Sequence, residues 1–466
     1  MAVAVNETEI AYAGVAGQAE LIRNGEISSV ELTQTLLKRI ERLNPSINAF
    51  RIVMADEALA EAATRDGAGA GRTRPLHGVP IAIKDEIDVA GQLTTFGTAA
   101  RTRPAAADGE LVARLRTAGA VIIGKTTMPE FGQWPFTESA AFGYTRNPWD
   151  LSRSTGGSSG GTAAAVAAGM VAVGIGGDGG GSIRIPSACC GLYGLKPTRG
   201  LVSTAPYQHL WHALGTQGPL ARSVRDSALV YDAIRTELPG HELGFATAAA
   251  TDPPRLRIAL SRKPAQRGVR LDAEQAGALE QMAAALRELG HEVHEHDPDY
   301  PEVAPAFVPQ FYGGVRDEVA LVERPDLLER RTKQTLALSR AIPESTVRWA
   351  IRRGAQIAER VNHFFEHHDV LLTPTIAALP RRLGALDGIG SLHASLRAVP
   401  YVAYTAVWNL CGNPAASIPA GFAGDGMPCA VQIVGAPGQE PMLLRLSAQL
   451  ERARPWADRR PPLDPA

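Results

Sequence analysis

Residues 152–186 read SRSTGGSSGGTAAAVAAGMVAVGIGGDGGGSIRIP and carry the densest chemical signal in the chain. Two glycine-rich turns flank an alanine-rich stretch, which predicts a buried helix followed by a short apolar run. Glycine-rich turns expose successive backbone N–H groups to a ligand at close range, because no Cβ blocks the approach. The segment therefore predicts a buried unit that presents an anion-binding loop.

The sequence after residue 71 alternates helices with short apolar strands. A helix over 110–118 ends at Gly119 and leads into the β-branched run 121–123, and similar units recur at 279–295 and 361–372. This alternation predicts an α/β fold in one large domain, with a central mixed sheet flanked by helices.

The N-terminal section, residues 1–70, is predicted to be helical and to pack on the α/β domain of residues 71–466. Ser28 and Glu31 are spaced as a capping box for a helix over 28–43. Within the α/β domain, clusters of Pro and Gly bound a variable segment at about 240–375, which we expect to be peripheral and to face the substrate.

The balanced charge of the chain excludes the class of proteins that bind nucleic acids or anionic membranes through an overall excess of basic residues. The 466 residues include 47 basic and 48 acidic side chains, for a net charge of −1. The uncharged stretch 154–177 has only about thirteen mainly apolar residues, too few to span a bilayer. The first residues lack the basic and apolar regions of a signal peptide, so we expect a cytoplasmic protein.

Four cysteines in so long a chain do not predict a disulfide framework, and we expect them to be buried apolar side chains. They are Cys189, Cys190, Cys411 and Cys429. The histidines of 291–296 are expected on an exposed polar strand face, and His363 and His367 near a helix end, so no metal site is predicted.

Ser182 directly follows three glycines, so its hydroxyl is expected beside the N–H groups of the turn. Such an arrangement suits an alkoxide that attacks a carbonyl group while the developing oxyanion is stabilised. A base is then needed. Lys84 ends an apolar strand-like run, where desolvation favours the neutral amine, although a surface lysine or one paired with Asp85 fits the same residues. His77, His209 and His212 stay open as bases, since triad partners can be distant in sequence.

The glycines 174, 176 and 179 match the spacing of a dinucleotide-binding fingerprint. The acidic residue expected about twenty positions later is absent, because no Asp or Glu lies between Asp178 and Asp226. A nucleotide-binding oxidoreductase is therefore only a weak alternative.

Lys84, the box Gly156–Gly161 and the stretch Gly180–Pro186 resemble the amidase signature family. The resemblance extends over most of the chain and is weakest between about 240 and 370. Further matching stretches are 76–80, 147–149, 190–198, 218–223, 409–414 and 432–435.

The resemblance implies the amidase signature fold and a Ser–cis-Ser–Lys triad without a metal or an organic cofactor. Ser182 is implied to be the nucleophile, Ser158, on a cis Gly157–Ser158 bond, the proton relay, and Lys84 the base and then the acid. The implied oxyanion hole consists of the N–H groups of Gly179, Gly180, Gly181 and Ser182. The implied supporting residues are Ser159, Asp178 and Arg184.

Two residues depart from the family pattern. The family commonly carries Thr or Ser at the position of Gly177, and Thr, Ile or a similar larger residue at that of Gly179. The loop is therefore smaller here, and the pocket beside the nucleophile is expected to be wider.

The resemblance implies an amidohydrolase that cleaves a carboxylic amide through an acyl-enzyme and that can extend to esters, anilides or carbamates such as urethanes. The expected partner is a small molecule, with no nucleic acid or membrane, and the expected state is a monomer or homodimer. Aromatic side chains in 300–365 and 131–142 could line the pocket or pack in the core. The alternative is the A subunit of a tRNA-dependent amidotransferase, but the run after Lys196-Pro-Thr198 differs from that subunit's pattern.

Overall fold

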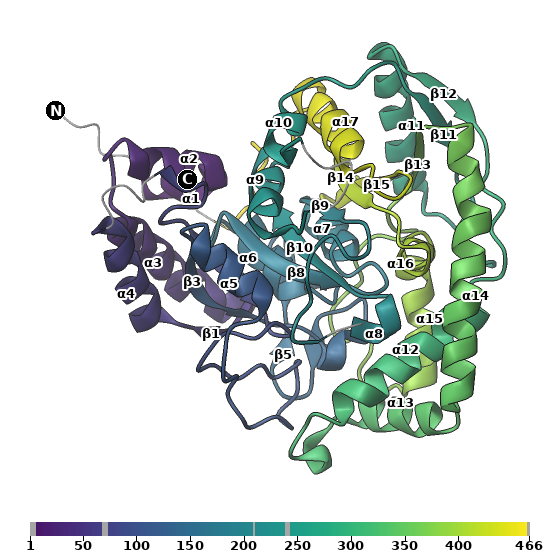
Figure 1. Cartoon of the computed structure of the whole chain (residues 1–466), viewed down its shortest axis with the longest axis horizontal. Coiled ribbons are helices and arrows are strands. Elements are labelled where there is room, and N and C mark those ends of the chain that lie inside the picture. The colour runs from purple at the N-terminus through teal and green to yellow at the C-terminus, as the bar shows by residue number, and fades with distance from the viewer. Residues whose placement is uncertain (1–5, 68–72, 208–209, 238–242, 464–466) are drawn as a thin grey trace.

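One mixed sheet organises the residues that the structure describes, 6–67, 73–207, 210–237 and 243–463, in this computed structural model (Figure 1). In spatial order its strands are β1 (Phe50–Val53), β3 (Val121–Thr126), β2 (Pro80–Lys84), β8 (Val173–Asp178), β10 (Thr216–Ala221), β9 (Tyr193–Lys196), β14 (Ala415–Phe422), β15 (Pro428–Val434), β13 (Val370–Pro374), β11 (Arg257–Leu260) and β12 (Glu292–Glu295). Two small ribbons pair β4 (Glu138–Ser139) with β5 (Gly143–Tyr144) and β6 (Arg146–Asn147) with β7 (Asp150–Ser154).

Helices cover both faces of this sheet. They are α1 (Glu7–Tyr12), α2 (Gly14–Arg23), α3 (Ser29–Ile47), α4 (Ala55–Asp66), α5 (Glu110–Thr117), α6 (Gly160–Ala167), α7 (Arg184–Cys190), α8 (Leu210–Ala213), α9 (Val224–Ile234), α10 (Phe245–Ala249), α11 (Ala273–Glu288), α12 (Ala304–Val319), α13 (Arg330–Arg340), α14 (Glu344–Asn362), α15 (Ser391–Val402), α16 (Ala406–Cys411) and α17 (Glu440–Ala453). No helix in the described ranges is long and apolar enough to cross a membrane.

Strand β2 shows how the two faces are filled. All five of its residues are buried, and successive side chains point to opposite faces of a sheet. Ile81 and Ile83 join the apolar cluster that includes α5, α9 and α11, whereas Ala82 joins the cluster that includes α3 and α6. Lys84 has the same parity as Ala82, so its side chain is directed to the face that carries α6.

The predicted α/β fold is confirmed, and two segments add strands to the sheet. The N-terminal section is not purely helical, because β1 pairs antiparallel with β3 and extends the sheet. The variable segment 240–375 also contributes to the sheet, since β11, β12 and β13 lie at its far edge. Its helix α14 runs along the right-hand edge of Figure 1, and α12 and α13 lie at the lower right.

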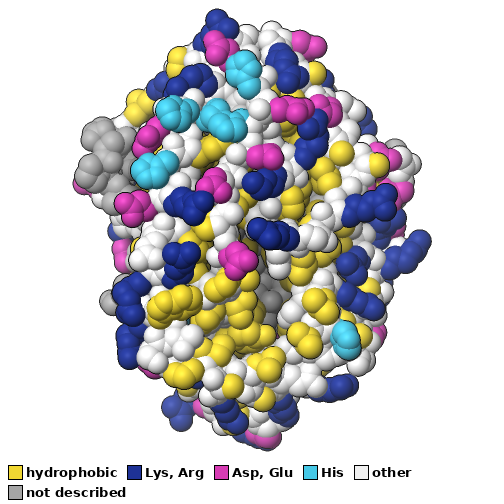
Figure 2. Space-filling model, turned by 90° about the vertical axis from the view of Figure 1, so that its right-hand side faces the viewer, with side chains coloured by type: hydrophobic (Ala, Val, Ile, Leu, Met, Phe, Trp, Pro, Cys, Tyr) yellow, Lys and Arg dark blue, Asp and Glu magenta, His cyan; other side chains and the backbone are white. Residues whose placement is uncertain are grey.

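The right-hand side of the molecule carries apolar side chains among basic ones, with histidines gathered toward one end (Figure 2). Five of the exposed apolar residues belong to α13, α14 and α15. They are Leu338, Trp349, Ile351, Leu392 and Leu396.

The predicted capping box at the start of α3 is present and can be tested. Ser28 Oγ accepts from the Glu31 N–H at 3.1 Å, and the Glu31 carboxylate accepts from the Ser28 N–H at 2.7 Å. We expect Ser28→Ala to lower the free energy of unfolding by about 1 kcal/mol in a denaturant titration. Gln34→Ala, on the exposed side of the same helix, is the control and should change it by less than about 0.5 kcal/mol. Equal losses in both variants would show that the cap contributes nothing.

Candidate active site

Parallel pairing of β2 with β8 places Lys84 and the loop of Ser182 at one edge of the sheet. Ala82 lies opposite Gly174 and Ile83 opposite Ile175, so both strands end on the same side. Lys84 ends β2, and the glycine loop that carries Ser182 follows β8 directly. Side chains at the carboxyl ends of neighbouring parallel strands meet at the same edge, which is where open α/β sheets bind ligands.

The amine of Lys84 contacts the hydroxyl of Ser158. Lys84 Nζ lies 2.8 Å from Ser158 Oγ, and the Gly157–Ser158 peptide bond is cis, as the resemblance implied. Lys84 is 1% exposed, Ser158 2% and Ser182 9%. Ser182 is therefore the member of the three that a substrate can reach most readily.

Ser159 joins the start of α6 to the end of β8. Its hydroxyl donates to the Gly177 carbonyl at 3.1 Å and accepts from the Gly177 N–H at 3.3 Å. Its own N–H donates to the carbonyl of Ser182 at 3.3 Å. These bonds hold the two glycine-rich turns together and direct the Ser159 hydroxyl to the backbone of Gly177, whereas the Ser158 hydroxyl contacts Lys84.

A buried ion pair fixes the loop before Ser182. Arg184 donates to both carboxylate oxygens of Asp178, at 2.9 and 3.0 Å, and also to Asn409 Oδ1 and Gln432 Oε1, both at 2.7 Å. Burial raises the pKa of Asp178, but the charge and hydrogen bonds of Arg184 outweigh it and hold that pKa well below its ordinary value. Asp178 thus stays ionised, which lets it bind backbone N–H groups of the loop.

The bond between Gly181 and Asp178 corrects the prediction that the Gly181 N–H belongs to the oxyanion hole. The Gly181 N–H donates to Asp178 Oδ1 at 2.7 Å, so it is not free for an oxyanion. Gly181 also has φ +128°, a conformation that favours glycine. Among the described residues, the N–H groups of Gly179, Gly180 and Ser182 have no hydrogen-bond acceptor.

The acidic partner of Lys84 is Glu86 rather than Asp85. Glu86 Oε2 lies 2.9 Å from Lys84 Nζ, whereas Asp85 binds Arg51 at 2.6 Å and Lys125 at 3.1 Å. Glu86 was not predicted from the sequence. It lies in the turn after β2, where the Ile87 N–H donates to the Lys84 carbonyl at 3.1 Å, so the alternation of side chains along a strand does not apply to it.

Aromatic side chains cover the glycine loop. A Cβ added at Gly179 would lie 2.7 Å from the Trp211 ring, and one at Gly180 would lie 3.2 Å from the Phe307 ring. Phe311 contacts both rings, with centroids 5.2 Å from Trp211 and 6.2 Å from Phe307. The Trp211 ring thus fills the space that a larger residue at position 179 would occupy. Gly179 therefore does not simply widen the pocket beside the nucleophile.

Trp211 was missed because its position depends on an irregular backbone. It has φ +51°, in a segment where His212 and Ala213 also have positive φ, and propensity does not predict such a turn. Of the aromatic residues singled out from the sequence, Tyr312 contacts Phe311, while Trp349 is 45% exposed.

The histidines considered as bases do not contact the two serines in the described residues. His77 precedes β2, at the end opposite Lys84, and His212 Nε2 pairs with Asp317 at 3.2 Å. His209 lies outside the described residues. His291 is buried and bonded to Gln449 at 2.8 Å, unlike the exposed position predicted for it.

Neither a metal cluster nor a reactive thiol is found in the described part of the chain. No group of three or more His, Cys, Asp or Glu there is arranged to hold a metal ion. All four cysteines are free and buried, and burial raises the pKa of Cys411 and of Cys429 to about 12. These thiols are expected to be unreactive at neutral pH.

The glycines of the dinucleotide-like pattern lie in a strand. Gly174 and Gly176 are inside β8 and pair with β10, and only Gly179 lies in the loop beyond it. A dinucleotide fingerprint needs its glycines in the turn between strand and helix, so this context does not fit one.

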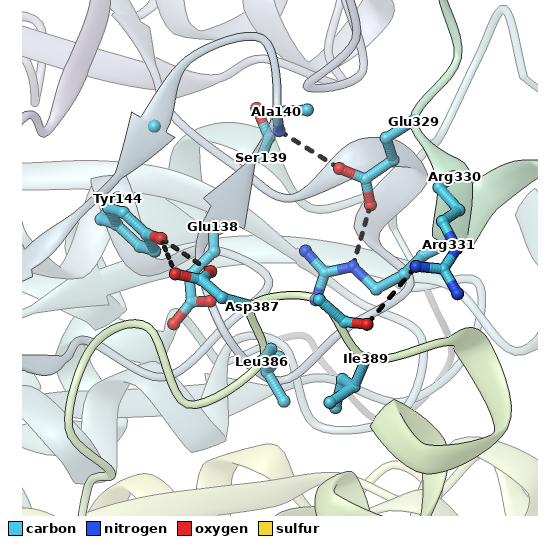
Figure 3. A pocket seen from close by; sticks show the side chains of 12 residues that line it. Glu138, Ser139, Ala140, Tyr144, Glu329, Arg330, Arg331, Leu386, Asp387 and Ile389 are labelled. Carbon is cyan, nitrogen blue, oxygen red and sulfur yellow. Dashed lines mark hydrogen bonds and ion pairs between the residues drawn. The ribbon is translucent and has the colours of Figure 1, made fainter.

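A separate pocket of about 400 Å³ lies between the β4–β5 ribbon, the start of α13 and the loop before α15 (Figure 3). Its polar groups are largely paired with one another: Tyr144 donates to Asp387 at 2.6 Å, and Glu329 lies 3.4 Å from Arg331. Burial raises the pKa of Glu138 in this pocket to about 7. None of Lys84, Ser158 and Ser182 lines it.

Comparison with known proteins identifies the family. The family model described as Amidase matches residues 31–444. The chain belongs to the amidase family. It is a hydrolase that acts on carbon–nitrogen bonds other than peptide bonds, and the family predicted from the motifs is confirmed.

Amidase relatives cover almost the whole chain. AmiB2 of Mycobacterium tuberculosis, an amidase by name, is 48% identical over 462 residues, covering 98% of this chain and 99% of its own. The solved structure of a 6-aminohexanoate cyclic dimer hydrolase is 34% identical with a TM-score of 0.91, covering 97% of this chain and 99% of its own. A bacterial aryl acylamidase structure is 27% identical with a TM-score of 0.85, covering 95% and 96%.

Loss of the Arg184 charge tests the brace of this amidase's loop. We expect Arg184→Leu to lower the free energy of unfolding by about 3–5 kcal/mol, because it leaves the Asp178 carboxylate buried without a counter-charge. Arg360→Ala, which breaks the exposed pair with Asp299, is the control and should cost less than about 1 kcal/mol. Denaturant titrations measure both values, and a loss in Arg184→Leu no larger than that of the control would contradict the brace.

Proposed function

We propose that this amidase cleaves small-molecule amides through an acyl-enzyme on Ser182, with Ser158 as proton relay and Lys84 as base and then acid. The observation that carries the proposal is the 2.8 Å contact between Lys84 Nζ and Ser158 Oγ beside the loop of Ser182. A buried amine in contact with a hydroxyl can accept a proton from it, provided that the amine is neutral.

The proposed reaction moves one proton along this path and back. Ser182 Oγ bonds to the carbonyl carbon while its proton passes to Ser158 Oγ, and the proton of Ser158 passes to Lys84 Nζ. The carbon–nitrogen bond then breaks, and the leaving nitrogen takes a proton back through Ser158. Water adds to the acyl group by the same relay, which releases the carboxylic acid and restores Ser182.

The proposed oxyanion hole consists of the N–H groups of Gly179, Gly180 and Ser182. These are the loop N–H groups that lack an acceptor in the described residues, whereas that of Gly181 serves Asp178. Preorganised N–H donors stabilise developing charge because they need not reorient during the reaction. The support of Asp178, Arg184 and Ser159 for the loop favours such preorganisation.

The substrates that the site fits best have an apolar or aromatic group next to the scissile bond. Trp211, Phe307 and Phe311 form an aromatic wall over the glycine loop, and pockets of this kind bind ligands mainly through apolar contact. Two of the relatives are named as a 6-aminohexanoate cyclic dimer hydrolase and as an aryl acylamidase. We therefore infer that anilides and amides with apolar groups are substrates, with matching esters and carbamates as candidates.

Replacement of the nucleophile is the first test. Ser182→Ala should lose essentially all amide turnover and keep its fold, because one hydroxyl in a glycine loop adds little to packing. A serine-directed phosphonyl reagent should label wild type at Ser182. The matched variant Ser159→Ala should still be labelled at Ser182. A Ser182→Ala enzyme with wild-type rate would overturn the assignment.

The role of Lys84 is tested by comparing an amide with an ester of the same acyl group. Lys84→Ala should lose about 10²–10⁴-fold in kcat/KM on the amide and less on the ester, whose leaving group needs less protonation. Lys84→Arg should fail nearly as badly, because a guanidinium keeps its proton. If Lys84→Arg hydrolyses the amide at a near wild-type rate, Lys84 is a structural cation and the base lies elsewhere.

A further inference from the structure

The base proposed above has an acidic neighbour that takes no part in the Ser–Ser–Lys relay. Glu86 Oε2 is 2.9 Å from Lys84 Nζ, and the Glu86 side chain is 12% exposed. Gly132 lies close to both Ser158 and Glu86. A Cβ added at Gly132 would be 3.1 Å from Ser158 Oγ and 3.7 Å from Glu86 Oε2. Lys84 therefore contacts a hydroxyl and a carboxylate at the same time.

The space that Glu86 occupies exists because residue 177 is glycine. A Cβ added at Gly177 would overlap Glu86 Oε1, so any larger residue there would displace the carboxylate. The other oxygen of that carboxylate binds Lys84. The departure from the family pattern at Gly177 and the contact of Glu86 with Lys84 are thus one linked feature of this chain.

The charged groups around Glu86 leave it as the counter-charge of Lys84. Burial and the charge of Glu86 raise the pKa of Glu318 on α12 well above its ordinary value, and Glu318 accepts from Trp211 Nε1 at 2.7 Å. Glu318 is bonded to Trp211 and forms no ion pair with Lys84 within the described residues. Asp317 on the same helix pairs with His212.

We propose that Glu86 is a positioning residue for Lys84, which it orients toward Ser158 and whose ammonium form it stabilises as the proton arrives. The proposal rests on the proposed function, since it assumes that Lys84 is the base. Glu86 keeps its charge throughout, and no proton passes to it. The physical role matches that of the aspartate in a Ser-His-Asp triad, which orients the base and stabilises its protonated form.

A pH profile distinguishes this role from a purely structural one. Glu86→Gln keeps the size of the side chain and removes its charge, so the ammonium of Lys84 loses its stabilisation. We expect the maximal amide kcat/KM to fall about 10- to 100-fold. The rising limb of its pH profile should move to lower pH by about one unit or more. An unchanged midpoint would overturn the proposal, whatever the loss in rate.

A double-mutant cycle tests the link to Gly177. Gly177→Ser should displace the carboxylate and lower kcat/KM at least as much as Glu86→Gln does. In a Glu86→Ala background, which has no carboxylate to displace, the same substitution should cost less than about threefold. Equal losses in the two backgrounds would overturn the link.

The matched control is Gly277→Ser on α11, a glycine with no atom close to the position of its added Cβ. It should leave kcat/KM unchanged. Thermal melting of each variant shows whether it is folded. If Gly177→Ser does not fold, the pH profile of Glu86→Gln still decides the proposal.

The two proposals can fail separately. A fully active Ser182→Ala enzyme removes the proposed function, and the role of Glu86 with it. Inactive Ser182→Ala and Lys84→Ala enzymes together with an unshifted Glu86→Gln profile remove only the role of Glu86.

Discussion

The contact of a buried lysine amine with a serine hydroxyl is the interaction on which the site depends. A buried ammonium is costly unless it is paired, and a neutral amine needs a hydrogen-bond partner. Lys84 has both kinds of partner, Ser158 at 2.8 Å and Glu86 at 2.9 Å. The neighbouring lysine, Lys125, is paired with Asp85, which also binds Arg51, so Lys84 and Lys125 contact different carboxylates.

The sheet and the glycines supply this contact. Parallel pairing of β2 with β8 sets the level at which Lys84 meets the loop of Ser182, and Ser159 joins that loop to the start of α6. The Asp178–Arg184 pair also holds the loop, because Arg184 donates to Asn409 and Gln432, which lie far away in sequence. The site is thus fixed by backbone packing and buried polar bonds, with aromatic side chains adapted to the space left at Gly179.

Local signals predicted much of this arrangement. The capping box at Ser28, the helix that follows it and the strand that ends at Lys84 all depend on neighbouring residues, and the structure contains each of them. The family motifs predicted the cis bond before Ser158 and the loop of Ser182.

Contacts that depend on tertiary placement were not predictable in the same way. Trp211 reaches the loop through a backbone with positive φ, and the bond of Gly181 to Asp178 depends on how the turn closes. Pairing of Lys84 with its neighbour Asp85 stayed open as an alternative, because sequence adjacency does not reveal that Asp85 is directed to Arg51 and Lys125.

The central claim is that the acyl group of the substrate is transferred to Ser182. Quenching the wild-type enzyme during turnover of an aryl ester and mapping the modified peptide by mass spectrometry tests it most directly. The account predicts an added acyl mass on the peptide that contains Ser182, lost on incubation in water and absent from Ser182→Ala. An acyl group on another residue, or rapid turnover with no adduct at any quench time in wild type, would contradict it.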